Sequence, residues 1–197
     1  MRRLAIALGV LLASAVAAAE WHVERSGARR VQFTSSVTNL SFGGATDQVD
    51  GFVYWDGEGL LPPAAQVHVE VDLNSLDTGI GKRDRDMREL LDTRRFPRAI
   101  FRGSLLAQTD VDSVAGVLQV RVGGTLSLRG VERELVAPAT IRLEPDRWHV
   151  RTEFSLRLSD YGIRAPSLAA FVKVSDQVQV QATFPMRPAV AGEETRR

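Results

Sequence analysis

The densest cluster of charged side chains lies in the stretch TGIGKRDRDM, residues 78–87. Its five successive charged residues, from Lys82 to Asp86, mix cations and carboxylates, which could serve acid–base catalysis, phosphate binding or a solvated connection. A phosphate loop is excluded because Lys82 is followed by Arg83 rather than Ser or Thr, and no Gly lies five residues before Gly81. A catalytic interpretation would need a partner base, which the sequence does not offer. We therefore interpret the stretch as the join between a strand and a following helix.

Arg83 and Asp84 are the members of this cluster with a predicted role. Asp84 or Asp86 would cap the following helix, and Arg83 with Asp84 would lock that helix, as a lid, onto the rest of the domain. Alternatively, Arg83 would also face an anionic head group, because its planar guanidinium suits phosphate. Gly79 is free to adopt the positive φ that a break between strand and helix often needs.

The remaining residues that could do chemistry are few and scattered. His22, His68 and His149 are far apart in the sequence and have no paired carboxylates at ligand spacing. No G-x-S-x-G elbow, dinucleotide fingerprint or EF-hand loop occurs, and the absence of cysteine excludes thiol catalysis, Cys-ligated zinc and iron–sulfur clusters. A formal net charge of +1 argues against a nucleic-acid binder. The sequence therefore predicts a protein that is not an enzyme and has neither metal nor cofactor.

The N-terminus has the form of a secretory signal peptide. Arg2 and Arg3 precede an apolar run over residues 4–12 that is too short to span a bilayer, which disfavours an uncleaved anchor. Three alanines ending at Ala19 then offer a cleavage site before Glu20. We expect cleavage after Ala19 and a periplasmic location.

The chain is expected to form one domain. Its 197 residues include 44% hydrophobic ones, enough for a single closed core. With residues 1–19 removed as signal peptide, the domain is predicted over 20–187. Residues 188–197 are polar and without periodicity, and are predicted to be a disordered tail.

Apolar and polar residues alternate with a period of two along most of the chain, which predicts that β-strands position these residues. In RWHVRTEFSLRL, residues 147–158, the even positions are almost all apolar and the odd ones polar, as in a strand with one buried face. Glu144-Pro145-Asp146 predicts a hairpin turn before this run, and Gly123-Gly124 predicts a bulge or bend. Further strands are predicted at 30–36, 48–55, 67–73, 98–107, 116–129, 135–143 and 174–184.

About eight antiparallel strands in one domain need their edges hidden, and closure into a barrel does this most completely. The regular alternation and the length of the strands favour a barrel over a sandwich. Helix is scarce: residues 84–92 predict one short helix, and 165–172 at most another turn. The predicted fold class is all-β, an antiparallel β-barrel with one or two short helices.

The alternation does not decide whether the interior of this barrel holds a ligand or is filled by its own side chains. Ala137, Ala139 and Gly103 lie in rows of residues that are expected to point inward. Such small residues either leave room for one ligand or fit the taper of a packed core.

Three ordered blocks of residues together form a recognisable sequence signature. The first runs from Ser75-Leu76-Asp77-Thr78-Gly79 through Arg83-Asp84 and Met87-Arg88 to Phe96-Pro97-Arg98-Ala99-Ile100-Phe101. The second is Gly124–Val131, and the third is Asp160-Tyr161-Gly162-Ile163 with Val174-x-Asp176-x-Val178. Together these blocks resemble the signature of the YceI-like polyisoprenoid-binding family, and the resemblance runs from about Val31 to Phe184.

Several positions depart from the family pattern. Asp86 stands where the family often has His, Leu90-Leu91-Asp92 replaces a common Phe-Phe-Asp, and Glu132 replaces Thr. The block Phe42-x-Gly44-x-Thr46 lacks the nearby His of many members. These differences leave the expected barrel intact and bear on its ligand, because a subfamily can keep a fold and change what it binds.

The resemblance implies a lipocalin-like barrel around an elongated apolar cavity that holds an isoprenoid lipid, such as a polyprenyl phosphate or a quinone, for transport, storage or stress protection. Two alternatives stay open: an accessory that delivers a quinone to a membrane cytochrome or quinone enzyme, and a packed interaction module without ligand. Arg83 and Asp84 are expected near the mouth. The residues expected to form the tunnel wall are Phe33, Val71, Phe101, Leu105, Leu126, Leu128, Phe154, Leu156 and Phe184.

Overall fold

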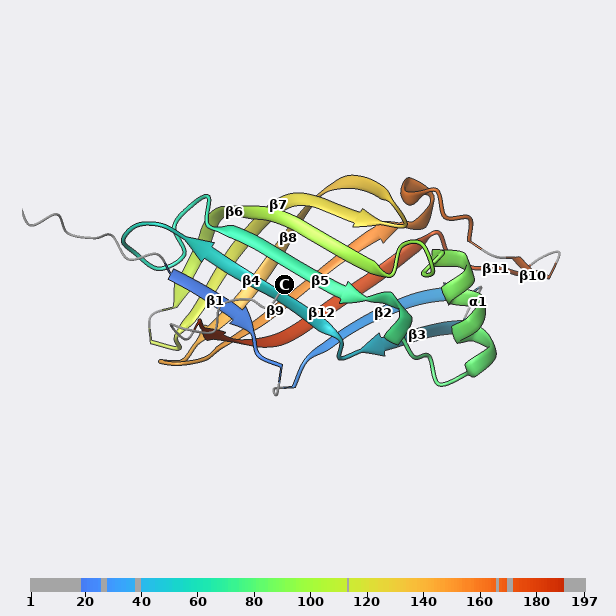
Figure 1. Cartoon of the computed structure of the whole chain (residues 1–197), viewed down its shortest axis with the longest axis horizontal. Helices are drawn as coiled ribbons and strands as arrows, with labels where there is room; N and C mark the ends of the chain where they lie inside the picture. Colours follow the sequence, from blue (N-terminus) through green and yellow to red (C-terminus); the bar gives the residue numbers. More distant parts are fainter. Residues whose placement is uncertain are drawn as a thin grey trace, which may run out of the picture.

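A computed structural model of the chain describes residues 19–25, 28–37, 40–112, 114–165, 167–169 and 172–189. Long strands run obliquely around the long axis of the molecule, and a single α-helix lies at one end (Figure 1). The predicted signal peptide up to residue 18 and the tail from residue 190 lie outside the described residues. Pro188, expected in the tail, is the last residue of the final strand.

Ten strands form one sheet. In chain order they are β1 (Ala19–Val23), β2 (Arg30–Val37), β3 (Leu40–Thr46), β4 (Val49–Trp55), β5 (Gln66–Asp72), β6 (Arg98–Asp112), β7 (Val117–Leu128), β8 (Val131–Leu143), β9 (Trp148–Arg157) and β12 (Gln177–Pro188). The helical elements are η1 (Leu73–Ser75), α1 (Gly81–Leu91) and η2 (Leu158–Tyr161). A separate small ribbon pairs β10 (Ser167–Ala169) with β11 (Val172–Lys173).

The sheet closes into a barrel through β12. The order β1-β4-β5-β6-β7-β8-β9-β12 returns to its start because β12 also pairs with β1. One edge of β12 is shared, since Met186–Pro188 pair with β1 and Gln179–Thr183 pair with β2. The β2–β3 hairpin extends the wall beyond β1 and β4, and a bridge between Ala45 and Asp77 links it to the chain after β5. The predicted antiparallel barrel of about eight strands is confirmed.

Several local predictions were wrong or incomplete. The sequence analysis did not predict the short strands β1 and β3. In β3 (LSFGGAT) a glycine pair breaks the alternation of apolar and polar residues. A Cβ added at Gly44 would lie 2.7 Å from the Phe33 ring, so this close approach of two strands requires glycine. The helical turn predicted over 165–172 was wrong, since the described residues there form the ribbon β10–β11.

The bulge predicted at Gly123-Gly124 lies in the neighbouring strand instead. Both glycines stay in continuous register within β7, whereas β6 shifts its register between Leu105 and Ala107. Leu106 is the extra residue, and its side chain covers Gly123. Gly124 is needed because β6 and β7 approach each other closely there: a Cβ added at Gly124 would clash with the Arg102 carbonyl oxygen, whereas one at Gly123 would meet the Leu106 side chain. The hairpin predicted at 144–146 is confirmed, with the Glu144 amide donating to the Arg147 carbonyl at 2.9 Å.

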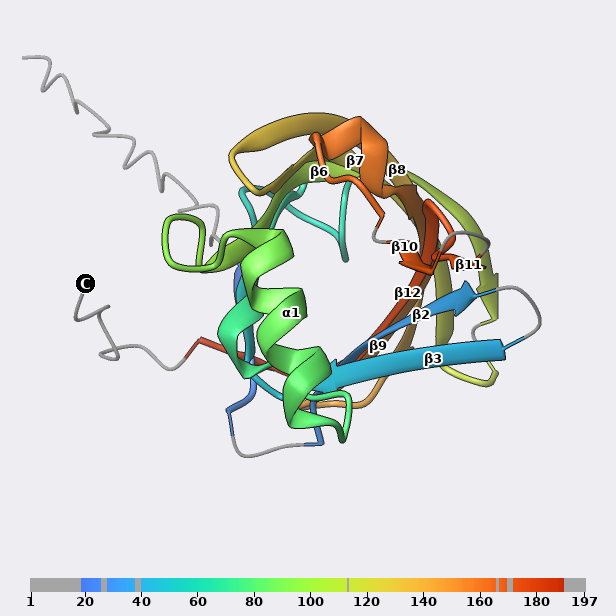
Figure 2. The same ribbon diagram turned by 90° about the vertical axis from the view of Figure 1, so that its right-hand side faces the viewer.

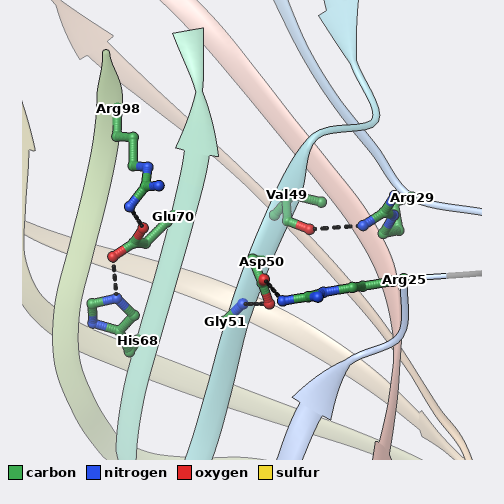
Figure 3. Close-up of polar contacts among 8 residues, drawn as sticks. All are labelled: Arg25, Arg29, Val49, Asp50, Gly51, His68, Glu70 and Arg98. Atoms are coloured by element: carbon green, nitrogen blue, oxygen red, sulfur yellow. Dashed lines mark hydrogen bonds and ion pairs between the residues drawn. The ribbon is translucent and has the colours of Figure 1, made fainter. Parts of the chain in front are cut away.

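Polar pairs brace the outside of the barrel across β4, β5 and β6 (Figure 3). The Glu70 carboxylate accepts from Arg98 at 2.8 Å and lies 2.8 Å from His68, and Arg25 donates to Asp50 at 2.9 Å. Because these contacts lie on the outward face, they stabilise the wall and leave the inward face to apolar residues.

Candidate binding cavity

The inward face of the barrel encloses a cavity of about 500 Å³. Inward side chains of β2 to β9 and β12 line it, and α1 adds the apolar Met87, Leu90 and Leu91 and the charged Arg83 and Asp86. The wall is overwhelmingly apolar, and the volume falls within the roughly 300–1,000 Å³ typical of small-molecule sites. A void of this size and polarity is suited to an apolar ligand. Figure 2 looks along the barrel from the α1 end and shows the ring of strands with the helix across part of its opening.

All nine residues predicted for the tunnel wall face this cavity. They come from six different strands, and Leu105, Leu126, Leu128 and Phe184 are buried. Ala137 and Ala139 also line it, where their small side chains leave space. Gly103 does not line the cavity; the backbone of Gly123 and Gly124 fills the place of its missing side chain.

Three tryptophans close the end of the cavity far from α1, which we call the tryptophan end. The Trp21 and Trp148 rings stack with centroids 3.7 Å apart and planes 13° from parallel, and the Trp55 ring also stacks on Trp148, with centroids 6.0 Å apart. Trp148 is only 3% exposed, and the Trp55 indole donates to the Gly59 carbonyl at 3.1 Å. Flat, interlocked rings from three strands leave little room for a ligand to enter here.

The end covered by α1, which we call the lid end, carries most of the polar groups that face the cavity. Ser35 is 6% exposed, and its hydroxyl finds no hydrogen-bond partner among the described residues. The buried Nε of Arg83 is likewise unpaired within the described chain. Phe42 lies directly opposite Ser35 in the β2–β3 register, and the guanidinium carbon of Arg83 lies 5.3 Å from its ring centroid. Since buried polar groups are costly without partners, this corner suits a ligand atom that accepts hydrogen bonds.

Arg83 and Asp84 both bind Thr78, and in this way they hold the start of α1 against the preceding segment. Arg83 donates from Nη2 to the Thr78 carbonyl at 2.7 Å. The Asp84 carboxylate accepts from the Thr78 amide at 2.9 Å and from its hydroxyl at 2.5 Å. These hydrogen bonds from Thr78 lower the pKa of Asp84, because they stabilise the ionised carboxylate. We call this group of three residues the lid clamp.

The predicted cap of the helix was wrong. α1 begins at Gly81, three residues earlier than expected, after the N-cap residue Ile80, which offers no side-chain hydrogen bond. Asp84 and Asp86 both lie inside α1; the Asp84 carboxylate is bound to Thr78, and Asp86 forms an ion pair with Lys82 at 2.8 Å. The positive φ predicted for Gly79 is confirmed at 74°.

The other motif residues have structural roles at the same end. Arg129 and Gly130 form the turn between β7 and β8 with φ values of 53° and 74°, and Arg129 donates to the Gly162 carbonyl at 2.6 Å. The Asp176 carboxylate accepts from the Ser159 amide at 2.8 Å and from its hydroxyl, which lowers the pKa of Asp176. These contacts tie η2 to β7 and to the start of β12, so that the rim is held in shape.

Ser35 and Phe42 are two residues of the lid end that line the cavity and that the sequence analysis did not predict as site residues. A signal for Ser35 existed, because it interrupts the inward row between Phe33 and Val37 with a hydroxyl group. Phe42 could not be placed, since its strand was not predicted. Among the described residues, no three His, Asp or Glu side chains come together as a metal site, and no helix is long and apolar enough to cross a membrane.

The sequence of the chain matches a known family over almost the whole barrel. The model of the YceI-like domain matches residues 21–186. The chain belongs to the YceI-like family. It is 30% identical over 175 residues to a UPF0312 protein of Enterobacter sp. (strain 638), covering 82% of this chain and 86% of that protein. Protein YceI of Salmonella newport (strain SL254) is 28% identical over 173 residues, covering 79% of this chain and 85% of that protein.

Solved structures of this YceI-like fold agree with the barrel. BcnA of Burkholderia cenocepacia superposes with a TM-score of 0.67 at 16% identity, covering 83% of this chain and 98% of that one. A polyisoprenoid binding domain from Saccharophagus degradans superposes with a TM-score of 0.66 at 22% identity, covering 86% and 98%. At these identities the likeness establishes the shared fold.

Proposed function

We propose that this YceI-like protein holds one isoprenoid-type lipid in the barrel and serves in its transport, storage or protection from stress. The observation that carries the proposal is the apolar cavity of about 500 Å³. Side chains from most strands of the barrel line it, and tryptophans close it at one end. Burial of apolar surface contributes about 25 cal/mol per Å², so a prenyl chain in this cavity would be held without covalent chemistry. The domain from Saccharophagus degradans with the same fold is named as a polyisoprenoid binding domain, which supports the same class of ligand.

The head group of the lipid is proposed to lie at the lid end. Ser35 and Arg83 offer buried donors there that have no partner among the described residues, whereas the tryptophan end is stacked and apolar. A quinone carbonyl or a phosphate oxygen would accept from them. The prenyl tail would then run along the nine predicted wall residues toward Trp148.

A pair of neighbouring substitutions tests whether the cavity is the binding site. Ala137 lines the cavity, whereas Val136 next to it points outward and is 50% exposed. Ala137→Phe would place an aromatic ring in the path of the prenyl chain inside the cavity, and should abolish stoichiometric loading with prenyl lipids. Val136→Phe, the matched control, should load like the wild-type protein.

The readout is organic extraction of the purified protein followed by mass spectrometry, before and after incubation with a polyprenyl phosphate or a quinone. A stoichiometric prenyl lipid in the wild type and in Val136→Phe, but not in Ala137→Phe, is the expected result. A clean wild-type extract that also resists loading with both lipids would refute the proposal.

Export to the periplasm is part of the proposal. It is supported by the basic pair, the apolar run and the three alanines before Glu20. The expected mature protein begins at Glu20 in the periplasmic fraction, and an intact N-terminus in the cytoplasmic fraction would contradict this part alone.

A further inference from the structure

The segment that covers the lid end is basic in a chain that is otherwise slightly acidic. Residues 79–98 contain seven basic and four acidic side chains, whereas the rest of the chain contains eighteen basic and twenty acidic ones. This segment includes all of α1 and the loop into β6, which together lie across one end of the barrel (Figure 2). The helix and loop that cover the opening of the cavity therefore carry a net positive charge.

Much of this positive charge is not neutralised locally. Lys82, Arg95 and Arg98 form ion pairs with Asp86, Asp92 and Glu70. Within the described chain, Arg85 and Arg94 have no ion-pair partner, and Arg83 and Arg88 form no direct ion pair but are attracted to the Asp84 carboxylate. Arg85 and Arg94 are exposed. Of the acidic residues left in the segment, Asp84 is buried in the lid clamp, and only Glu89 remains exposed and unpaired among the described residues.

Apolar side chains stand exposed beside this charge. Ile80, directly before α1, is 53% exposed, and Leu40, at the first position of β3, is 75% exposed. Leu40 and Phe42 lie on the same side of β3, and Phe42 lines the cavity, so Leu40 stands on the rim of the opening. Exposed apolar residues next to unpaired arginines are the combination that binds an anionic lipid surface, where the charges are attracted to head groups and the apolar side chains insert between them.

We propose that the lid end is a docking face for an anionic phospholipid bilayer. In that orientation the opening between α1 and β3 faces the membrane, and a lipid cargo would pass between bilayer and cavity without crossing water. The use of this face for cargo rests on the proposed function, whereas docking itself depends only on the charges and apolar residues of the rim. The tryptophan end would then face away from the bilayer.

Vesicles without any prenyl lipid test this docking separately from cargo binding. The protein is mixed with vesicles of phosphatidylcholine alone, or of phosphatidylcholine with phosphatidylglycerol, and bound protein is measured by sedimentation. Wild type should bind only the anionic vesicles, and high salt should weaken the binding. The double variant Arg85→Glu with Arg94→Glu should lower the apparent affinity about tenfold or more.

Two further variants make the test specific for this face. Arg142→Glu with Arg151→Glu changes the net charge equally on exposed arginines of β8 and β9, and should bind like wild type if position matters. Leu40→Ser with Ile80→Ser should weaken binding without changing its salt dependence. Equal losses in the two arginine double variants, or no binding of wild type to anionic vesicles, would overturn the proposal even if extraction had shown a bound prenyl lipid.

Discussion

The two ends of the barrel are closed by different kinds of contact. At the tryptophan end, Trp21, Trp55 and Trp148 stack into an apolar plug whose central ring is 3% exposed. At the lid end, one short helix is held by the lid clamp on Thr78, above a corner with a buried, unpaired hydroxyl. One end is closed by the packing of aromatic rings, and the other by a helix that combines hydrogen bonds with the apolar contacts of Met87, Leu90 and Leu91.

This difference assigns separate tasks to the two ends. Packing of large aromatic rings contributes strongly to stability and is hard to open, because many contacts are lost together. A few hydrogen bonds contribute about 0.5–1.5 kcal/mol each and can be exchanged for others. We therefore expect the tryptophan end to determine the stability of the barrel and the lid end to determine access to the cavity.

Trp148→Ala should have the largest effect on stability. It removes the central ring of the plug, and we expect the free energy of unfolding to fall by about 3–5 kcal/mol, as for other buried aromatic residues. Urea denaturation followed by circular dichroism measures this loss, and Trp148→Phe is the milder control. A loss below about 1 kcal/mol would show that the plug is not what holds this end closed.

Arg83→Ala should cost less, because it removes one hydrogen bond and one contact with an aromatic ring at the lid end. We expect a loss of about 1–2 kcal/mol, both in the ligand-free protein and in the loaded one. Arg83→Lys keeps the charge and should recover part of the loss. Unchanged thermal unfolding combined with weakened lipid binding would instead show that Arg83 acts on the head group and not on the lid.

Strong acid should destabilise the lid end while the rest of the barrel stays almost unchanged. This effect should be smaller than those of the two substitutions above. Hydrogen bonds lower the folded-state pKa of Asp84 and Asp176, both at this end, so their stabilising contribution is present above the ordinary carboxyl pKa of 3.8 and is lost as the pH falls through the lower folded value. Hydrogen exchange of α1 should therefore accelerate in strong acid before that of β9.

Asp84→Asn tests how much the lid clamp contributes to this acid response of α1. It should speed exchange in α1 already at neutral pH and flatten the acid response of the helix, whereas Asp86→Asn, which removes only the exposed pair with Lys82, should change little. Equal acceleration of β9 and α1 would contradict the assignment of the acid response to the lid end.

Prediction from the sequence was strongest where the buried face of a strand repeats without interruption. The strands around 147–158 and 135–143 were placed within a few residues, because inward and outward positions alternate strictly there. The missed strand β3 shows the limit, since Gly43 and Gly44 carry no side chain that could report a face. Likewise, the helix was found, but its cap was not, because Asp84 has a better partner in Thr78.

The sequence by itself determined the all-β class and most of the long strands, because period-two alternation and local turn residues depend only on neighbours along the chain, and its three motif blocks indicated the family. Tertiary structure alone decided that β12 pairs with both β1 and β2, that three tryptophans from distant strands meet, and that Ser35, Phe42 and Arg83 share one corner. These arrangements join residues far apart in sequence, so they follow from how the sheet closes and how closely its strands approach, which alternation does not encode.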